Sequence, residues 1–156
     1  MTARGFSVIE LLVTLSLLAL LATVSLPLVQ IQAQREKEKE LRRALVEIRE
    51  AIDAYKLAAD AGRVEKKTGA SGYPKSLDLL AEGVPDLRSP DGRKLYFLRR
   101  VPRDPFAIHP DLPAAQTWFK RAYASPPHSP EEGEDVYDIA SRSNKIGLNG
   151  IALKEW

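Results

Sequence analysis

The chain has 156 residues with 23 Lys and Arg against 21 Asp and Glu, so its formal net charge at pH 7 is only +2. The basic residues are interleaved with acidic ones, which is not the pattern of a nucleic-acid-binding surface, and we expect no nucleic acid among the partners. The absence of cysteine excludes a disulfide framework and thiol chemistry and is compatible with a periplasmic domain.

A long apolar run begins close to the N-terminus. From Leu11 to Gln34 no side chain is ionisable, and at a rise of about 1.5 Å per residue a helix over these residues exceeds the roughly 30 Å hydrocarbon core of a bilayer. The run therefore predicts a membrane-spanning helix. Glu10 stands at its start, and a carboxylate within a bilayer costs a few kcal/mol, so such a residue usually has a partner.

The residues around Glu10 carry a specific pattern. A short basic leader, residues 1–4, precedes Gly5 and Phe6, and Glu10 is the fifth residue counted from Phe6. This pattern resembles the N-terminus of type IV pilins and type II secretion pseudopilins. The resemblance implies that a membrane-bound prepilin peptidase cuts between Gly5 and Phe6 and methylates the new terminal Phe6. It also implies that the Phe6 amine pairs with Glu10 of a neighbouring subunit, an arrangement that lowers the cost of both charges.

Two further features bear on this interpretation. Pro27 lies within the run, and a proline there predicts a kink or local opening of the membrane helix. A secretory signal peptide matches less well, because such signals have an apolar core of about 7 to 15 residues and end in a small-residue cleavage site.

The charges that flank the run disagree with the resemblance about orientation. Arg4 precedes the run and five basic residues follow it closely, which by the positive-inside rule alone would place the C-terminal part in the cytoplasm. The resemblance implies instead a single-pass protein of the bacterial inner membrane with a periplasmic C-terminal domain, and we adopt that orientation. The five basic residues are Arg35, Lys37, Lys39, Arg42 and Arg43.

We expect the helix to continue beyond the apolar run, from about Phe6 to Ala59. Its second half carries apolar residues at spacings of four and three, the narrow stripe of a helix that packs against something. We expect this stripe to be buried against the chain's own globular part, with a coiled-coil partner helix as the alternative. The stripe consists of Leu41, Leu45, Ile48, Ile52 and Tyr55.

The rest of the chain predicts a small mixed domain. Ala61 and Gly62 indicate the end of the long helix, and Ser76 is a candidate N-cap for a short helix closed by Gly83. Nine of the 11 prolines lie between Pro85 and Pro130, which excludes long helices there. The candidate strands are residues 95–101, 118–124 and 136–140.

The predicted fold class is therefore α+β and pilin-like. A long N-terminal helix, with a membrane half and an amphipathic half, packs on a small antiparallel β-sheet domain. The expected divisions are a leader over 1–5, a transmembrane and assembly helix over 6–30, and a periplasmic domain over 31–156. Within that domain the helix continues over 31–60, and residues 61–156 form a short helix and a small β-sheet.

The order of motifs after the helix extends the resemblance. Tyr73-Pro74 is followed by Val-Pro-Arg-Asp-Pro-Phe at 101–106, by Val-Tyr-Asp-Ile-Ala-Ser at 136–141 and by Glu155-Trp156. In this order the motifs are similar to those of the major pseudopilin of type II secretion systems. Type IV pilins usually carry a C-terminal disulfide loop instead, and this chain has no cysteine to form one.

The chain departs from that family where the family would bind a metal. The resemblance implies a calcium loop rich in Gly and Asp after the Tyr-Asp-Ile strand, but the matching residues 141–150 contain no carboxylate. Calcium takes about six to eight oxygen ligands with carboxylates among them, and Arg142 and Lys145 add repulsion. We therefore predict no calcium and no other cofactor. The degenerate loop retains Ser141, Ser143 and Asn144 as its polar positions.

Two turns are predicted within the globular part. In Pro102 to Phe106 the prolines fix φ, Asp104 caps its own turn, and Phe106 closes the edge of the core. Asn149-Gly150 between Leu148 and Ile151 is a strong two-residue hairpin signal, which predicts a type I′ turn in place of the metal.

Catalytic function is not indicated, and we expect no enzyme. His109 and His128 lie in Pro-rich segments without a carboxylate at ligand spacing. The acidic cluster at residues 131–135 lies on a segment bounded by Pro and Gly, without the burial that would separate its pKa values into acid and base. The sequence contains neither a Gly-x-Ser-x-Gly elbow nor a phosphate-binding glycine loop.

These patterns together predict a structural subunit of a type II secretion pseudopilus that supports protein export across the outer membrane. The expected partners are copies of the same chain in a helical filament, other pseudopilins, the inner-membrane secretion platform and prepilin peptidase. A pilin-like subunit of a type IV pilus or competence machine is the alternative within the same class. From another class, the alternative is an uncleaved inner-membrane anchor that presents a periplasmic binding domain.

Overall fold

The computed structural model describes residues 7–156, apart from the side chains of residues 23–28. Over these residues the chain has a long N-terminal helix and a small antiparallel β region, which confirms the α+β part of the prediction. Residues 1–36 and 37–156 are two compact units. The helices are α1 (Val8–Asp60) and α2 (Asp78–Glu82), with 3₁₀ turns η1 (Ala114–Gln116) and η2 (Leu153–Glu155); the strands are β1 (Val84–Pro85), β2 (Lys94–Leu95), β3 (Trp118–Arg121) and β4 (Asp138–Ser141).

The long helix α1 covers 53 residues, as the sequence predicts. It ends where expected, because Gly62 adopts φ 68°. The Gly62 amide donates to the Ala59 carbonyl at 3.0 Å, and the Arg63 amide donates to the Ala58 carbonyl at 2.9 Å. This pair of bonds is the Schellman arrangement, in which a left-handed glycine satisfies the last carbonyls of a helix.

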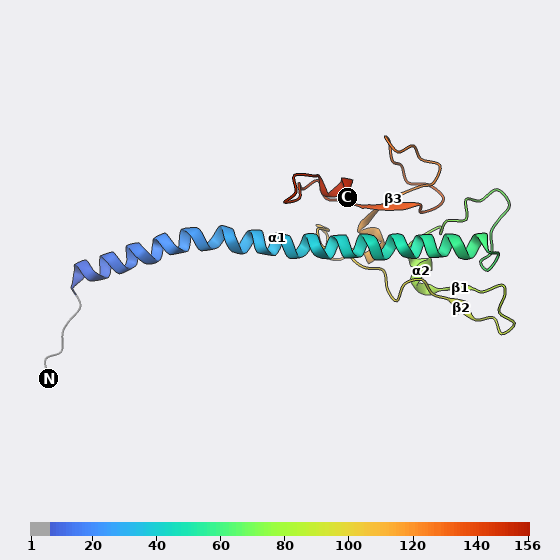
Figure 1. Cartoon of the computed structure of the whole chain (residues 1–156), viewed down its shortest axis with the longest axis horizontal. Coiled ribbons are helices and arrows are strands. Elements are labelled where there is room, and N and C mark those ends of the chain that lie inside the picture. Colours follow the sequence, from blue (N-terminus) through green and yellow to red (C-terminus); the bar gives the residue numbers. More distant parts are fainter. Residues whose placement is uncertain (1–6) are drawn as a thin grey trace. The chain divides into compact units, whose positions relative to one another are not determined.

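The predicted stripe of α1 is buried. Leu41, Ile48 and Ile52 are fully enclosed, and Leu45 and Tyr55 are nearly so. Their neighbours come from segments distant in the sequence, including Leu77, Leu80, Trp118, Ile139 and Leu153. In the globular unit, α1 lies between β3 on one side and α2 with the β1–β2 pair on the other (Figure 1). The stripe therefore packs against the chain's own globular part.

Two small antiparallel sheets flank the helix. β1 pairs with β2 through Val84 opposite Leu95 and Pro85 opposite Lys94. β3 pairs with β4 in a register that sets Trp118 opposite Ser141 and Arg121 opposite Asp138. A small antiparallel β region was predicted, but its division into two separate two-stranded sheets was not.

The prediction of one strand over residues 95–101 is wrong. Only Leu95 of this range lies in a strand, and its partner strand β1 was not predicted. The amides of Phe97 and Leu98 both donate to the Leu80 carbonyl at 2.9 Å, so this part of the chain bonds to α2 and not to a neighbouring strand.

The other two candidate strands are correct in position but not in extent. β3 ends at Arg121, because the Ala122 amide donates to the Glu131 carbonyl at 2.9 Å. β4 begins only at Asp138, because the Val136 amide donates to the Pro74 carbonyl at 2.7 Å. Loop contacts thus replace ladder bonds at one end of each strand.

The short helix α2 ends as predicted and begins differently. Gly83, with φ 77°, terminates it, and the Gly83 amide donates to the Leu79 carbonyl at 3.2 Å. Ser76 is not the N-cap, because that position is taken by Leu77 with helical dihedral angles and no side-chain cap bond. Leu77 is completely buried, so apolar packing determines where the helix begins.

Ile52→Ala should lower the free energy of unfolding by about 2 to 5 kcal/mol, because it empties a completely buried site in the core. Leu57→Ala is the matched control on the same helix, since Leu57 is 71% exposed, and it should change stability by less than about 0.5 kcal/mol. Urea unfolding of the full chain in detergent, followed by tryptophan fluorescence, measures both. Equal losses would contradict this account of the core.

Candidate functional site

The predicted processing and assembly residues lie at the N-terminus. Gly5 and Phe6 fall outside the residues that the structure describes, so the cleavage and methylation site stays a prediction. Glu10 is described and lies exposed in the first turn of α1. A carboxylate at this end of a helix is favoured by the partial positive charge of the unsatisfied amides.

Apolar side chains surround α1 on all sides just after Glu10. Every side chain from residue 7 to residue 22 is exposed, including Leu11, Leu15 and Leu18. The hydroxyls in this run bond to the helix itself, with Thr14 donating to the Leu11 carbonyl at 2.9 Å and Ser16 to the Leu12 carbonyl at 2.8 Å. An apolar surface of this extent is typical of regions that contact a membrane or another protein.

The predicted membrane span and its kink lie partly outside the described residues. Among the residues whose side chains the structure describes, 7–22 and 29–156, no helical segment has both the length and the apolar character needed to cross a membrane. Pro27 lies within the bounds of α1, but its side chain is among those outside the described residues, so the kink stays a prediction.

The C-terminal segment, residues 141–156, is fastened to α1 by three charged side chains. The Leu148 amide donates to Glu38 Oε1 at 2.8 Å. The Arg42 guanidinium lies over the Trp156 ring, 4.5 Å from its centroid. Arg49 donates to the Trp156 main-chain oxygen at 2.9 Å. Glu38, Arg42 and Arg49 are spaced by four and seven residues, which places them along one face of the helix.

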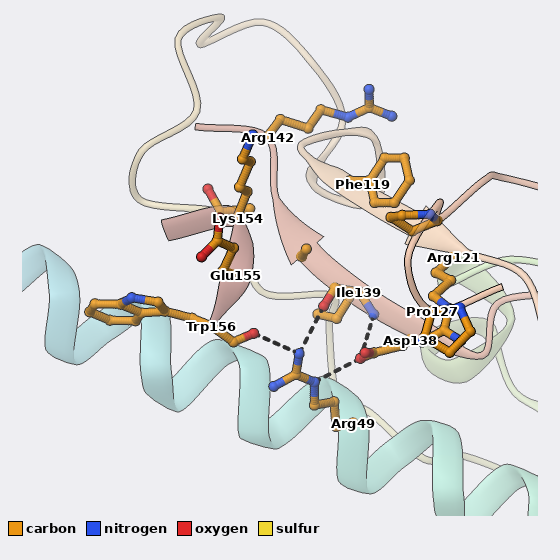
Figure 2. A pocket seen from close by; sticks show the side chains of 13 residues that line it. Arg49, Phe119, Arg121, Pro127, Asp138, Ile139, Arg142, Lys154, Glu155 and Trp156 are labelled. Carbon is orange, nitrogen blue, oxygen red and sulfur yellow. Dashed lines mark hydrogen bonds and ion pairs between the residues drawn. The ribbon is translucent and has the colours of Figure 1, made fainter. Parts of the chain in front are cut away.

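Arg49 joins three parts of the chain (Figure 2). Its Nε bonds to Asp138 Oδ1 at 2.8 Å, and its Nη2 donates to the carbonyl oxygen of Ile139 at 3.1 Å as well as to Trp156. The planar guanidinium, with five donors, is suited to such multiple contacts. Arg49 therefore ties α1 to both β4 and the C-terminal segment.

A hollow of about 540 Å³ lies beside Arg49, between β3, β4, the loop that carries Pro127 and Pro130, and the C-terminal segment. Phe119 and Pro127 contribute apolar wall, and the charged groups of the lining are largely engaged within the chain. Arg142 pairs with Glu132 at 2.6 Å, and Arg121 donates to the Ser125 carbonyl at 3.1 Å. These pairs support the walls of the hollow and do not converge on a common point within it.

The turn in the C-terminal segment differs from the predicted type I′ turn. Type I′ requires positive φ at both central residues, but among the described residues only glycines have positive φ, and here that residue is Gly150 with 79°. The Gly150 amide donates to the Gly147 carbonyl at 2.9 Å and the Gly147 amide to the Ile151 carbonyl at 2.8 Å. This is a three-residue hairpin loop closed by a left-handed glycine, and Asn149 Oδ1 accepts from the Ile151 amide at 3.1 Å.

The polar groups of the degenerate loop do not fit a calcium ion. The Ser141 hydroxyl donates to Asp104 Oδ2 at 2.6 Å and accepts from the Ser143 amide at 3.1 Å. The Ser143 hydroxyl in turn accepts from the Lys145 amide at 3.3 Å, and Asn144 is exposed. Within the described part of the chain, no three His, Cys, Asp or Glu side chains gather closely enough to hold a metal ion.

Asp104 confirms the predicted turn and has a second role that the sequence did not indicate. Its Oδ1 accepts from the Phe106 amide at 2.7 Å, which closes the turn on itself, and Phe106 packs against the core. Asp104 is only 2% exposed, and its other oxygen receives the Ser141 hydroxyl. One buried carboxylate thus links this turn to the end of β4.

The histidines and the acidic cluster occupy separate exposed positions. His109 and His128 lie on exposed loops, and Glu131, Glu132 and Glu134 are exposed as well. Asp135 is engaged within the chain, because Oδ1 accepts from the Tyr123 amide at 2.9 Å and Oδ2 receives the Ser71 hydroxyl. The structure brings neither histidine together with this cluster into a metal site among the described residues.

A further ion pair joins the segment just after α1 to the turn between β1 and β2. Arg63 Nη2 lies 2.6 Å from Asp86 Oδ2, and the Leu87 amide donates to the Arg63 carbonyl at 2.8 Å. The hydrogen bond from Arg63 holds the pKa of Asp86 below its usual value. A lowered carboxyl pKa gives stability above the ordinary pKa of the group, which is lost as the pH falls through the lowered value.

The sequence did not single out Glu38, Arg42 or Arg49 as partners of the C-terminal segment. All three are charged residues next to the buried stripe. From the sequence alone, a solvent-exposed side chain explains a charged residue at each of these positions equally well. In the C-terminal segment, Glu38 and Arg49 bond to main-chain atoms more than a hundred residues away. Nearly every residue type has the same main-chain groups, so the sequence does not indicate such partners.

Comparison of the chain with protein-family models, with curated proteins and with solved structures gives no match.

Arg49→Met should lower the free energy of unfolding by about 1 to 2 kcal/mol. The substitution keeps the apolar stem, removes three hydrogen bonds and leaves Asp138 without its ion pair. Bonds to charged groups contribute about 1.5 to 3 kcal/mol when shielded, and the value here is reduced by partial exposure. Arg43→Met, at an exposed position of the same helix, is the control, and equal urea midpoints for the two variants would contradict the role of Arg49.

Proposed function

We propose that this chain is a subunit of a membrane-derived helical filament of the pseudopilin type, serving type II secretion. The observation that carries the proposal is the placement of one carboxylate, Glu10, in the first turn of a 53-residue helix whose next residues are exposed and apolar on every side. The proposal is further supported by the Gly5-Phe6 pattern before Glu10 and by the α+β fold around the second half of α1.

The exposed apolar side chains must be shielded from water both in the membrane-bound precursor and in the assembled filament. Burying a single Leu or Val side chain is worth about 1.5 to 3 kcal/mol. Ten large aliphatic residues are exposed between Val8 and Leu21, and each would carry about this cost in water. Lipid covers this surface in the precursor, and the equivalent helices of neighbouring subunits cover it in the filament.

Glu10 supplies register where apolar packing alone does not. Aliphatic side chains pack against one another in several axial positions, whereas a charge pair is satisfied in one. Cleavage after Gly5 creates an amine on Phe6, four residues before Glu10, and this amine can reach Glu10 of an adjacent subunit. Leaving either charge unpaired among apolar helices costs several kcal/mol, so one alignment is selected.

The second half of α1 is part of the core of the globular unit. The stripe from Leu41 to Tyr55 is the central part of that core, so the unit cannot leave α1 without unfolding. An axial force on the helix is therefore borne by the whole subunit, as a secretion filament requires.

The intact mass of the protein purified from its native membrane should correspond to a chain that begins at a methylated Phe6. The physical reason is that the Phe6 amine, half of the proposed ion pair, exists only after cleavage. A mass that still includes residues 1–5 in cells with an active prepilin peptidase would contradict the proposal and favour the uncleaved anchor.

Glu10→Ala should keep membrane insertion and cleavage but lower filament yield at least about tenfold, because the amine of each subunit loses its partner. Sheared filaments and membrane fractions, quantified by immunoblot, separate assembly from insertion. Glu65→Ala, which removes the same charge from an exposed loop, is the matched control. Normal filament yield from Glu10→Ala would refute the register role.

A further inference from the structure

We propose that the carboxylate of Glu38, on α1, takes the place of a divalent cation and holds the hairpin of residues 145–153 in its folded position. The replacement of a cation rests on the proposed function, because only the resemblance to pseudopilins implies a metal here, whereas the hold of Glu38 on the hairpin rests on contacts within the globular unit.

The central contact is a shielded hydrogen bond between distant parts of the chain. The Leu148 amide donates to Glu38 Oε1 at 2.8 Å across 110 residues of sequence. Glu38 is only 7% exposed, so water competes little for its carboxylate. Hydrogen bonds to an ionised acceptor are roughly twice as strong as neutral ones, which makes this contact a strong fastening for a single amide.

Hydrogen bonds within the chain organise the base of the hairpin. The hydroxyls of Ser141 and Ser143 each accept the amide two residues further on, at 3.1 and 3.3 Å. The Leu153 amide closes the base by donating to the Lys145 carbonyl at 2.9 Å, and Ile146 pairs with Ala152 in an antiparallel bridge. The Ser141 and Ser143 hydroxyl oxygens and the Lys145 carbonyl therefore already serve as hydrogen-bond acceptors within the chain.

Trp156 supports the turn independently of Glu38. A side-chain carbon added at Gly147 would lie 2.6 Å from Cζ2 of Trp156, which shows that the indole packs directly on the glycine backbone. The same ring lies under the guanidinium of Arg42, 4.5 Å from the ring centroid and one helical turn after Glu38. The turn is thus held by two successive positions of one helix face.

The distribution of charge also favours this arrangement. Residues 141–150 contain no carboxylate, and of their two basic residues Arg142 pairs with Glu132 whereas Lys145 is exposed. The segment therefore offers a cation no carboxylate ligand of its own. In a metal-dependent loop the carboxylates lie on the loop and the positive charge is the ion. Here the carboxylate that bonds to the hairpin lies on the helix, which makes the hairpin depend on α1.

Residue-resolved hydrogen exchange on the full chain in detergent micelles tests the inference. In the wild-type protein the Leu148 amide should exchange at the same rate with millimolar Ca²⁺ as with EDTA. Glu38→Ala should speed its exchange at least about tenfold, the size expected for loss of a hydrogen bond to a charged group. Glu47→Ala, at an exposed position of α1, is the matched control and should leave the rate unchanged.

Two results would overturn the inference. One is slower exchange of the wild-type hairpin in Ca²⁺ than in EDTA, which would assign its fastening to a metal. The other is a Glu38→Ala rate equal to that of Glu47→Ala. Far-ultraviolet circular dichroism establishes that each variant is folded. If Glu38→Ala is not folded, Glu38→Gln serves instead, because its amide oxygen still accepts but without charge and should give a smaller increase in rate.

Discussion

Burial of one stripe of α1 is the interaction on which the rest of the globular unit depends. The strands of the unit are two or four residues long, and two-stranded sheets of this size are not stable in water by themselves. Ile48 and Ile52 lie completely enclosed, and the fully buried Trp118 and Ile139 bring β3 and β4 into the same core. The sheets are stable because they pack against the helix. Their positions on the helix in turn fix where the loops between them begin and end.

The two halves of α1 are adapted to different surroundings although one helix contains both. Residues 37–60 alternate buried and exposed positions with the period of an amphipathic helix, whereas residues 7–22 are exposed all round and almost wholly apolar. A helix that is hydrophobic on every side is buried in a large core or in a membrane. The proposed function follows from this contrast: one half contributes the stripe at the centre of the globular core, and the other half exposes apolar side chains over residues 7–22.

Features specified by a few adjacent residues could be predicted from the sequence, and features that depend on tertiary contacts could not. The stripe from Leu41 to Tyr55, the glycine ends at Gly62 and Gly83 and the self-capped turn at Asp104 each follow from local geometry. The β1–β2 pairing could not be predicted, because two-residue strands show no periodicity. The fastening by Glu38 joins a side chain to a main-chain amide, which any residue at position 148 except proline would supply. The residues Asn149-Gly150 favour a type I′ turn locally. The contacts of Leu148 with Glu38 and of Trp156 with Gly147 favour a three-residue loop instead.

The group that holds the C-terminal segment in place, a metal ion or a side chain of α1, determines whether folding of the segment depends on metal concentration. A loop completed by a metal folds in proportion to the occupancy of that metal, because the binding free energy of the ion is part of the folding free energy. A carboxylate fixed on α1 is present whenever the helix is formed, and Glu38, Arg42 and Arg49 are positioned by the same stripe that builds the core. Formation of the core thus brings all three groups to the segment at once. On the proposed role of Glu38, the segment is stabilised by the helix, and its order is a property of the chain and not of the calcium concentration in the surrounding solution.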